Sequence, residues 1–417
     1  MSGRRPVVVV TGVGVVTPLG IGRADNWAAL TAGRSGIRRI TRFPTEGCRT
    51  TIAGAVEFLP ESGAPSPVLT EALAMLAAEE AIAGAGIGRR GAFPGPLFLG
   101  TPPVELDWRQ RLALAQAGGD TAGGYAAMIA AARGRTDLYE MALFGGIAHH
   151  LADRLGTRGA PIALTTACAT GATAIQMGVE AIQRGETDAA IAIGADGSVN
   201  TESLIRFSLL SALSTRNDDP EAAPRPFEKN RDGFVMAEGA GALVLERLEA
   251  AQARGARILA VMSGCGERAD NFHRTRSSPD GGAIIGAIRN ALDDAGLRPE
   301  QIGYINAHGT GTPENDKMET LGVTAVFGAH AASVPISSNK SMIGHTLSAA
   351  GAIEAVFTIE TILHQRLPPT INHDEPDPAI PLDVVPNVAR DAPVAHAMSN
   401  SFGFGGQNTC LVFSAPG

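Results

Sequence analysis

The chain is poor in cysteine and in long apolar runs, and each shortage excludes a class of protein. Four of its 417 residues are cysteines, scattered as Cys48, Cys168, Cys265 and Cys410. No CxxC pair or Cys/His cluster has zinc-site spacing, and so few cysteines do not build a disulfide framework. The sequence therefore predicts reduced thiols, no metal centre and a cytoplasmic protein.

No apolar run reaches the roughly 18 residues that a membrane-spanning helix needs. Residues 7–16 follow two arginines, as the core of a secretory signal does. Threonine and glycine interrupt this stretch, however, and no small-residue cleavage motif follows it. We expect a buried β-strand there, and no insertion into a membrane.

Positive charge and aromatic residues are also scarce. The chain has 34 Lys and Arg against 42 Asp and Glu, a net charge of −8, and 5% aromatic residues. An acidic chain lacks the broad basic surface that binds nucleic acid, so nucleic acid is not an expected partner. Glycine is abundant at 51 residues, which indicates close backbone packing and many tight turns.

Short apolar runs alternate with helical patterns, which is typical of a layered α/β protein with buried strands. We expect strands at 7–16, 96–99, 161–164, 189–194, 241–245, 258–262, 302–307, 334–337, 397–401 and 409–413. We expect helices at 71–83, 172–184, 282–295 and 349–364. Segments 101–150 and 197–235 show no regular pattern, and we interpret the second as a connection packed over a site.

A weak internal repeat divides the chain. The small-residue turn 165–171 and the turn 338–345 each follow a short strand and precede a helix, late in their halves. Such a repeat predicts two similar halves, residues 1–255 and 256–417, with the two turns face to face.

The segment Thr-Thr-Ala-Cys-Ala-Thr-Gly-Ala at 165–172 places Cys168 between a strand and a helix. Unpaired N–H groups and the positive end of the helix dipole favour a thiolate there, and the thiolate is the nucleophilic form. A cysteine among small residues is also commonly an inert buried side chain. This segment alone leaves both interpretations open.

Several groups in the second half could act with this thiol. His308 lies in a Gly/Thr-rich loop, Lys340 and His345 precede a helix that carries Glu354, and a glycine-rich turn surrounds Phe404. Each feature alone has a structural explanation, such as a strand-end histidine or a hairpin turn. Together they are the parts of a thiol-acylation site.

In this order, the motifs resemble the elongating (ketosynthase II-like) β-ketoacyl-[acyl-carrier-protein] synthases of the thiolase superfamily. The resemblance covers nearly the whole chain, through residues 10–14, 17–20, 167–169, 231–234, 238–241, 308–312, 339–345 and 403–406. It implies a thiolase-like fold in which two βαβαβαββ halves form a five-layered α-β-α-β-α core. It also implies a homodimer, and a heterodimer with a related subunit stays open.

The resemblance implies a decarboxylative Claisen condensation. Cys168 would take an acyl chain from acyl carrier protein, and the enolate formed from malonyl-carrier protein would attack that thioester to give a 3-oxoacyl-carrier protein. His308 and His345 would stabilise the enolate oxygen as neutral imidazoles donating from Nε2. The backbone N–H groups of Cys168 and Phe404 would form the oxyanion hole.

Further roles follow from the same resemblance. Lys340, held by Glu354, would set the local field, and Phe404 would act as a gate. Thr310 and Thr312 would hydrogen-bond the phosphopantetheine arm, which the carrier protein brings, so no other cofactor is expected. In some relatives a structural cation lies near the positions that match Asn306, Glu354 and Asn400.

Two stretches depart from the family pattern. The bulky segment 101–109 stands where relatives carry a small turn that lines the acyl pocket, which suggests a specialised acyl substrate and makes Trp108→Gly a test. The docking arginine of relatives corresponds to Ser211 here, so Arg206, Arg274 and Arg276 become candidates for carrier-protein docking.

Three other interpretations fit less well. A catalytically silent, chain-length-factor-type partner would lose the nucleophile, whereas Cys168 is present with both histidines. A thiolase would carry a second cysteine in a Cys-Gly context, but Cys410 is followed by Leu-Val. The G-x-S-x-G elbow of α/β-hydrolases is absent.

Overall fold

Two five-stranded units of identical topology make up the central sheet. The structure, a computed structural model, describes residues 5–88, 91–117 and 124–417. The first unit has the strand order β6-β5-β7-β8-β1 and the second has the order β11-β10-β15-β16-β9. In both units the first three strands in this order run parallel to one another. The fourth strand pairs antiparallel with the third and with the fifth. The expected duplication is therefore present in the fold, and the border at residue 255 stays a prediction.

The strands of the first unit are β1 (Val8–Thr17), β5 (Leu97–Gly100), β6 (Ile162–Leu164), β7 (Ala189–Asp196) and β8 (Gly239–Arg247). Those of the second are β9 (Ala260–Ala269), β10 (Tyr304–Asn306), β11 (Pro335–Ser337), β15 (His396–Phe402) and β16 (Gln407–Ser414), with β13 (Asp383–Val384) beside β11. Three residue pairs between β1 and β9 join the units into one sheet. The short strands are β2 (Gly20–Ile21), β3 (Arg38–Arg39), β4 (Ile52–Ala53), β12 (Arg366–Leu367) and β14 (Arg390–Asp391).

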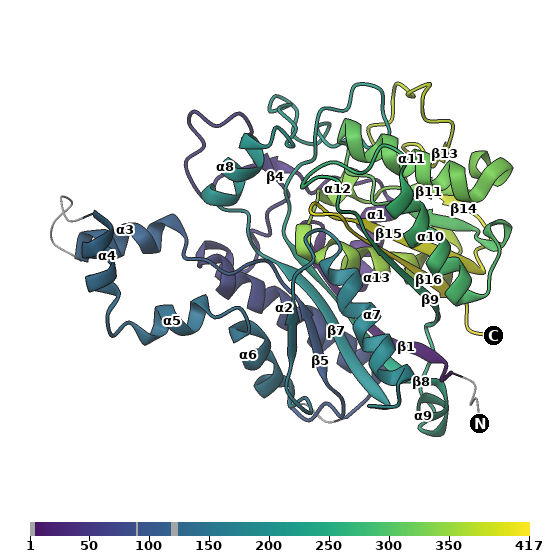
Figure 1. Cartoon of the computed structure of the whole chain (residues 1–417), viewed down its shortest axis with the longest axis horizontal. Coiled ribbons are helices and arrows are strands. Elements are labelled where there is room, and N and C mark those ends of the chain that lie inside the picture. The colour runs from purple at the N-terminus through teal and green to yellow at the C-terminus, as the bar shows by residue number, and fades with distance from the viewer. Residues whose placement is uncertain (1–4, 89–90, 118–123) are drawn as a thin grey trace.

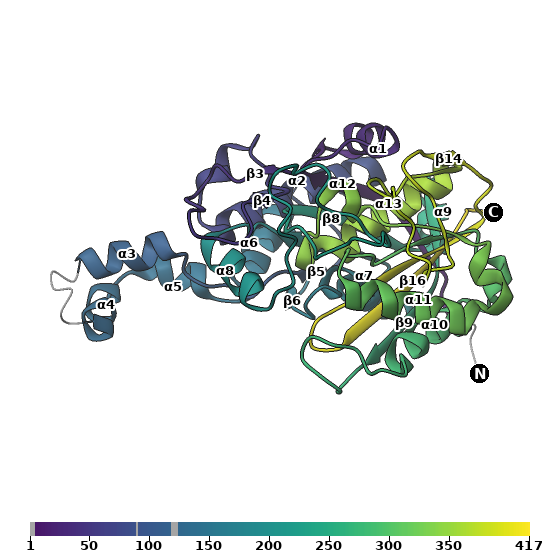
Figure 2. The same ribbon diagram turned by 90° about the horizontal axis from the view of Figure 1, so that it is seen from above.

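Helices form three layers around and between the two sheet units (Figures 1 and 2). Helix α2 (Ser66–Ala85) packs on β1, β7 and β8, and α10 (Gly282–Ala295) packs on β9 and β16. Helices α7 (Thr170–Gln183) and α13 (Ala350–His364) lie between the units, where α7 packs on β5 and β7 and α13 packs on β8 and β15. The result is the five-layered α-β-α-β-α core of the thiolase-like fold.

Strand β7 illustrates how the layers are held. Ala190 and Ala192 belong to the apolar cluster around α7 and α13, whereas Ile191 and Ile193 belong to the cluster around α2. Successive side chains of a strand point to opposite faces, so a strand covered on both faces is apolar at every position. This is why the strands were predictable as continuous apolar runs.

The two central helices touch through glycine. A Cβ on Gly171 of α7 would lie 2.6 Å from the Ala352 nitrogen, and a Cβ on Gly351 of α13 would lie 2.5 Å from the Ala172 nitrogen. Only glycine permits such a close backbone approach. The crossing brings together the turns that precede the two helices, one carrying Cys168 and the other His345.

The segment 101–150 differs from the expectation of irregular structure. It contains α3 (Trp108–Ala117), α4 (Gly124–Ala132), α5 (Thr136–Ala142) and α6 (Gly146–Leu155). Helices α3 to α5 form an arm beside the core (Figures 1 and 2). Helices α3 and α5 each bury one residue, Leu114 and Leu138, so the arm lacks the apolar periodicity that identifies a helix.

The remaining helices complete the molecule. They are α1 (Arg23–Thr31), α8 (Thr201–Leu209), α9 (Leu248–Ala253), α11 (Pro313–Phe327) and α12 (Lys340–Ile343). Helix α8 interrupts the connection 197–235, and the Asn200 side chain caps it by accepting from the Ser203 N–H. By length and composition the stretch Leu347–His364 could cross a membrane, but 89% of it is buried inside the protein, where it forms a core helix.

Candidate active site

A tight turn between β6 and α7 presents Cys168. The preceding residue, Ala167, has φ of 50°, a left-handed conformation that non-glycine residues seldom adopt. The Thr170 hydroxyl holds this turn, because it accepts from the Thr166 N–H at 2.8 Å and donates to the Ala167 carbonyl. Cys168 is 9% exposed, so the thiol reaches the cavities around it but little bulk water.

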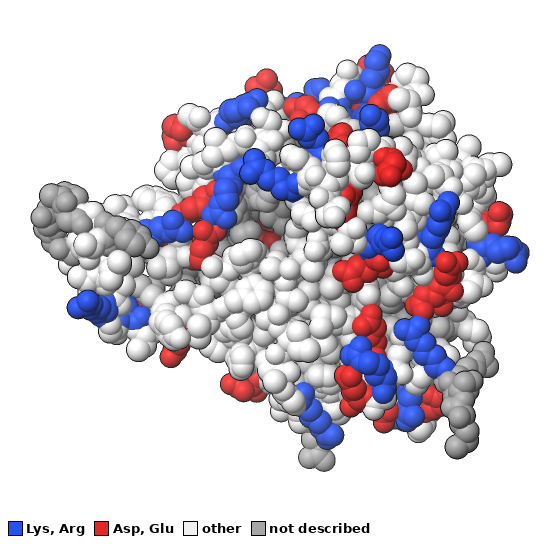
Figure 3. Space-filling view, viewed as in Figure 1, with Lys and Arg blue, Asp and Glu red and all other residues white. Residues whose placement is uncertain are grey.

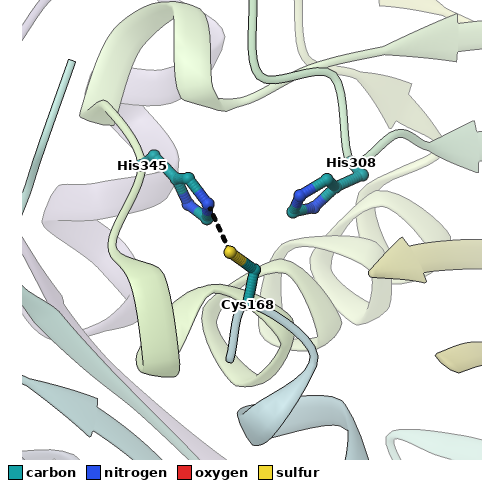
Figure 4. Close-up of side chains that lie close together, drawn as sticks. All are labelled: Cys168, His308 and His345. Atoms are coloured by element: carbon teal, nitrogen blue, oxygen red, sulfur yellow. Dashed lines mark hydrogen bonds between the residues drawn. The ribbon is translucent and has the colours of Figure 1, made fainter. Parts of the chain in front are cut away.

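Two histidines converge on the thiol from the second half of the chain. His345 Nε2 lies 3.1 Å from Cys168 Sγ, and the ring centroids of His308 and His345 are 5.2 Å apart. One nitrogen of each ring and the sulfur all lie within 4.8 Å of one another. Figure 4 shows both imidazoles pointing toward the sulfur.

The hydrogen bonds at the far side of each ring assign its tautomer. The Leu347 N–H donates to His345 Nδ1 at 3.3 Å, and Lys340 Nζ lies 3.3 Å from His308 Nδ1. Both Nδ1 atoms therefore accept, and both Nε2 atoms carry hydrogen. Burial, followed by the charge of Lys340, lowers the pKa of both histidines well below the usual value. The site thus offers two neutral N–H donors to a substrate oxygen.

Lys340 is buried and paired. Its Nζ contacts the Glu354 carboxylate and donates to the His308 carbonyl at 2.7 Å. Burial raises the pKa of Glu354 to about 7, although Lys340 opposes this shift. A buried ion pair of this kind fixes position more than it adds stability. Lys340 is thereby held against His308.

Glu319 of α11 is a site residue that the sequence reasoning missed. Its carboxylate accepts from the N–H groups of His308 and Gly309 at 2.9 and 2.7 Å, and Asn400 Nδ2 donates to it at 3.1 Å. Burial raises the pKa of Glu319 to about 7. The carboxylate holds the histidine loop by its backbone, and no local motif marks such a role.

Burial raises the pKa of Cys168 to about 11, although a hydrogen bond from the Phe404 N–H and the charge of Lys340 lower it. Desolvation thus opposes the helix dipole, which favours a thiolate. Helix α7 begins two residues after Cys168, and the helix dipole acts only within its first turn, so desolvation dominates. Desolvation therefore favours the neutral thiol in the free protein.

Two cavities meet at Cys168 and Phe404, which line both. The first, of about 560 Å³, contains His308, His345 and the predicted Thr310 and Thr312. The second, of about 400 Å³, extends along segment 101–107 and α8. Figure 3 shows a hollow between α8 and the α3–α5 arm with charged groups of both signs at its rim. Gly405 and Gly406 follow Phe404 at φ of 86° and 87°.

The structure places the residues expected to set acyl-chain length and to dock the carrier protein in different parts of the molecule. Trp108 does not line the second cavity but a recess of about 80 Å³ beside Arg42, so Trp108→Gly does not test the acyl pocket. Arg206 pairs with Glu105 and lines the second cavity. Arg276 lines the first cavity, and the Arg274 carbonyl accepts from the Gly405 N–H at 2.8 Å.

Several buried oxygens near the active site have no hydrogen-bond partner in the part of the chain that the structure describes, and three of them belong to the residues that match the cation site of some relatives. They are Asn306 Oδ1, Glu354 Oε2 and Asn400 Oδ1. The amide nitrogens of both asparagines are bonded, to the Glu354 carbonyl and to Glu319, which assigns the oxygens as free acceptors. Carboxylate and amide oxygens suit a hard cation. These residues fit the structural cation that the sequence resemblance implies.

Known proteins are similar to this chain in sequence and in fold. The model of the Beta-ketoacyl synthase N-terminal domain matches residues 5–251, and that of the C-terminal domain matches residues 259–374. A "Putative polyketide beta-ketoacyl synthase 1" of Streptomyces cyaneus is 38% identical, with 98% of each chain covered. A "3-oxoacyl-[acyl-carrier-protein] synthase 2" of Synechocystis is 39% identical, with 97% of each covered.

Solved structures agree with these relatives. "The ishigamide ketosynthase/chain length factor" superposes with a TM-score of 0.85 at 36% identity, covering 99% of this chain and 100% of that one. A type II polyketide ketosynthase, in complex with its acyl-carrier protein and bound to the hexaketide, gives 0.89 at 32% identity with the same coverage. Both family models and relatives of matching length place the whole chain in one group: it belongs to the β-ketoacyl synthase family.

Proposed function

We propose that the protein condenses an acyl chain on Cys168 with malonyl-acyl carrier protein, releasing carbon dioxide and giving 3-oxoacyl-acyl carrier protein. One observation carries this proposal. The Cys168 sulfur lies 3.1 Å from one imidazole and beside a second, where two cavities join. A cavity on each side of the nucleophile accommodates a held acyl chain and an incoming thioester at the same time.

The first half-reaction is acyl transfer. The Cys168 sulfur attacks the acyl thioester carbon, the carbon–sulfur bond to the carrier's arm breaks, and the thiol proton leaves with the departing thiolate. The backbone N–H groups of Cys168 and Phe404 stabilise the oxyanion, a role supported by the position of both residues where the two cavities join.

The second half-reaction takes place in the first cavity. The malonyl carbon–carbon bond breaks, carbon dioxide leaves, and the electron pair moves onto the thioester oxygen. The Nε2–H groups of His308 and His345 donate to that oxygen. The enolate carbon then attacks the Cys168 thioester, and the Cys168 sulfur leaves as a thiolate that takes a proton from water. Thr310 and Thr312, whose hydroxyls lie 2.9 Å apart in this cavity, bind the phosphopantetheine arm.

The same three atoms of Cys168, His308 and His345 could also hold a metal ion. A metal would have to displace the hydrogen from both Nε2 atoms, and the Nδ1 acceptor bonds favour that hydrogen. The position of these three residues where two cavities join favours a role in substrate chemistry over metal binding. The only group that the proposed reaction requires is the arm that the carrier protein brings.

The partner is an acidic acyl carrier protein, which Arg276 and Lys317 of the first cavity would meet. The chain pairs with a second copy or with a related ketosynthase through β6, an edge strand whose Ile162 is 39% exposed. We place the protein in the cytoplasm, where its four free cysteines would stay reduced.

Product analysis tests the proposal. The protein, acyl-carrier protein and malonyl-carrier protein are mixed, and the carrier proteins are analysed by mass spectrometry. We expect 3-oxoacyl-carrier protein from the native protein and none from Cys168→Ala. Carbon dioxide release without an acyl product would contradict the condensation. A native protein that forms no product and loads no acyl chain would support the silent-partner alternative.

A further inference from the structure

Asp196 is a buried carboxylate to which the proposed reaction gives no role. It ends strand β7, in the first half of the chain, and is fully buried. Its Oδ1 accepts from the N–H and the hydroxyl of Ser198, and its Oδ2 accepts from the Ser348 N–H at 3.1 Å. Hydrogen bonds from a backbone N–H to a carboxylate are about twice as strong as neutral ones. Asp196 therefore ties the first half of the chain to the turn that follows His345.

This turn contains a residue in an unfavourable backbone conformation. Leu347 has φ of 47°, in the left-handed region, which costs a residue other than glycine about 1–2 kcal/mol. In this conformation the Leu347 N–H donates to His345 Nδ1 at 3.3 Å, while the next N–H along the chain, that of Ser348, donates to Asp196. A strained conformation persists only where its surroundings hold it, and the bond to Asp196 is such a hold.

The backbone of His345 is fixed from a different side. Its N–H donates to the Val235 carbonyl at 2.7 Å, and its carbonyl accepts from the Ala237 N–H at 2.9 Å. These two bonds set where the imidazole lies, but not which of its nitrogens carries the hydrogen. The Leu347 N–H decides the second point, because it donates to Nδ1 and so leaves the hydrogen on Nε2.

Strand β7 lies directly against this turn. A Cβ on Gly194 would lie 3.3 Å from the Ser348 carbonyl oxygen and 2.8 Å from the Ala352 Cβ. Asp196 follows Gly194 by two residues, so its side chain is on the same face of the strand. The carboxylate thus reaches the turn from a rigid, buried strand end, as a positioning group requires.

We propose that Asp196 is a positioning residue for His345, because it holds Leu347, through the Ser348 N–H, in the conformation that keeps the His345 hydrogen on Nε2. This inference rests on the proposed function, since it concerns the imidazole that would stabilise the enolate. Without the bond to Asp196, Leu347 relaxes and its N–H leaves Nδ1. The ring then carries its hydrogen on either nitrogen, and with the hydrogen on Nδ1 it has no donor for the enolate oxygen.

Two activities of Asp196→Ala test this role. The first is carbon dioxide release from malonyl-carrier protein, and the second is alkylation of Cys168 by iodoacetamide, located by peptide mass analysis. We expect kcat for carbon dioxide release to fall about tenfold, the value of one hydrogen bond, with KM unchanged. Alkylation should not slow, because an unprotonated Nε2 accepts the thiol hydrogen and the Asp196 charge that raises the pKa of Cys168 is gone.

Two further variants separate positioning from stability. Asp196→Asn keeps an oxygen that can accept from the Ser348 N–H, so its kcat should lie between those of Asp196→Ala and the native protein. Glu246→Ala is the matched control, because Glu246 is also a buried carboxylate but lines neither cavity and bonds to Thr11 and Arg254. It should lower the unfolding temperature and keep the native kcat.

The position of the hydrogen is measured directly on the native protein. Histidine labelled with ¹⁵N distinguishes a protonated from an unprotonated ring nitrogen by NMR, and His345→Gln identifies the signals of this ring. We expect hydrogen on Nε2 in the native protein and a mixture of both forms in Asp196→Ala. This measurement needs no variant at Asp196 for its first result, so the inference can fail even if Asp196→Ala does not fold.

The outcomes are distinct. An unchanged kcat in a folded Asp196→Ala, a parallel loss of both activities, or a native His345 with its hydrogen on Nδ1 would overturn the inference and leave the condensing function intact. If the native protein releases no carbon dioxide from malonyl-carrier protein, the proposed function itself fails, and the inference fails with it.

Discussion

We propose that the two active-site histidines act as hydrogen-bond donors from Nε2, because the Nδ1 atom of each ring is turned toward a donor. The donors are the Leu347 N–H for His345 and the Lys340 ammonium for His308. Neutral donors suit an enolate oxygen, since they stabilise developing charge without taking part in proton transfer. The mechanism therefore depends on both rings staying neutral over the working pH range.

This dependence predicts the pH profile of malonyl decarboxylation. Burial and Lys340 lower the pKa of His308 and His345, so the neutral form persists below the usual histidine pKa of about 6.5. We expect the rate of carbon dioxide release, measured at saturating malonyl-carrier protein, to stay constant as the pH falls through about 6.5. A half-maximal rate near that pH would show that a histidine titrates normally.

Removing Lys340 should lower the stability of the protein, because it leaves the buried Glu354 carboxylate without a partner. In Lys340→Met the carboxylate loses its partner, and we expect a loss of about 3 kcal/mol in the free energy of unfolding. The pKa of Glu354 is already raised in the folded protein and rises further in the variant. The penalty should therefore grow as the pH rises above the usual glutamate pKa.

Chemical denaturation at several pH values measures this penalty. The double variant Lys340→Met/Glu354→Gln should recover most of the stability, since no buried charge is left unpaired. Equal stability of Lys340→Met and the native protein at high pH would show that Lys340 does not compensate Glu354.

At the scale of elements, the strands and core helices were predictable because burial leaves a pattern. The helix expected at 282–295 matches α10, Gly282–Ala295, and the helix expected at 172–184 matches α7 to within two residues. The arm helices α3 to α5 were missed because so few of their side chains are buried. A helix that buries no face has no regular spacing of apolar residues, so the sequence pattern does not reveal it.

The residues of the candidate site also fall into those that the sequence predicts and those that it does not. Cys168, His308 and His345 lie in local motifs that the sequence displays. Glu319 acts through contacts between elements distant in the chain, which only packing creates. The desolvation that raises the pKa of Cys168 could not be predicted, because a local sequence does not report burial by distant elements.

The crossing of α7 and α13 can be tested with one added methyl group. Gly351→Ala would place a Cβ 2.5 Å from the Ala172 nitrogen, and we expect a loss of about 1–3 kcal/mol or more in unfolding free energy. Gly84→Ala in α2 is the matched control, because its Cβ meets nothing within 4 Å. It should stabilise the protein slightly, as alanine favours helix. Equal thermal unfolding of the two variants would contradict the backbone contact.

At the scale of the whole molecule, one edge of the sheet is β6, beside the nucleophile turn. Exposed sheet edges are templates for pairing with another chain. If two copies pair there, Ile162→Lys should give a monomer of 42.9 kDa by light scattering, whereas the native protein should give twice that mass. Val388→Lys, at a position 73% exposed elsewhere, should leave the dimer intact. A native monomer would refute pairing between identical copies.

The condensing function is tested most directly by loading and chasing the Cys168 adduct. The protein is incubated with acyl-carrier protein, its intact mass is recorded, and malonyl-carrier protein is then added. We predict one acyl adduct that peptide analysis places on Cys168, and its loss at the rate at which 3-oxoacyl-carrier protein forms. An adduct that malonyl-carrier protein does not discharge, or an acyl group on another residue, would contradict the account.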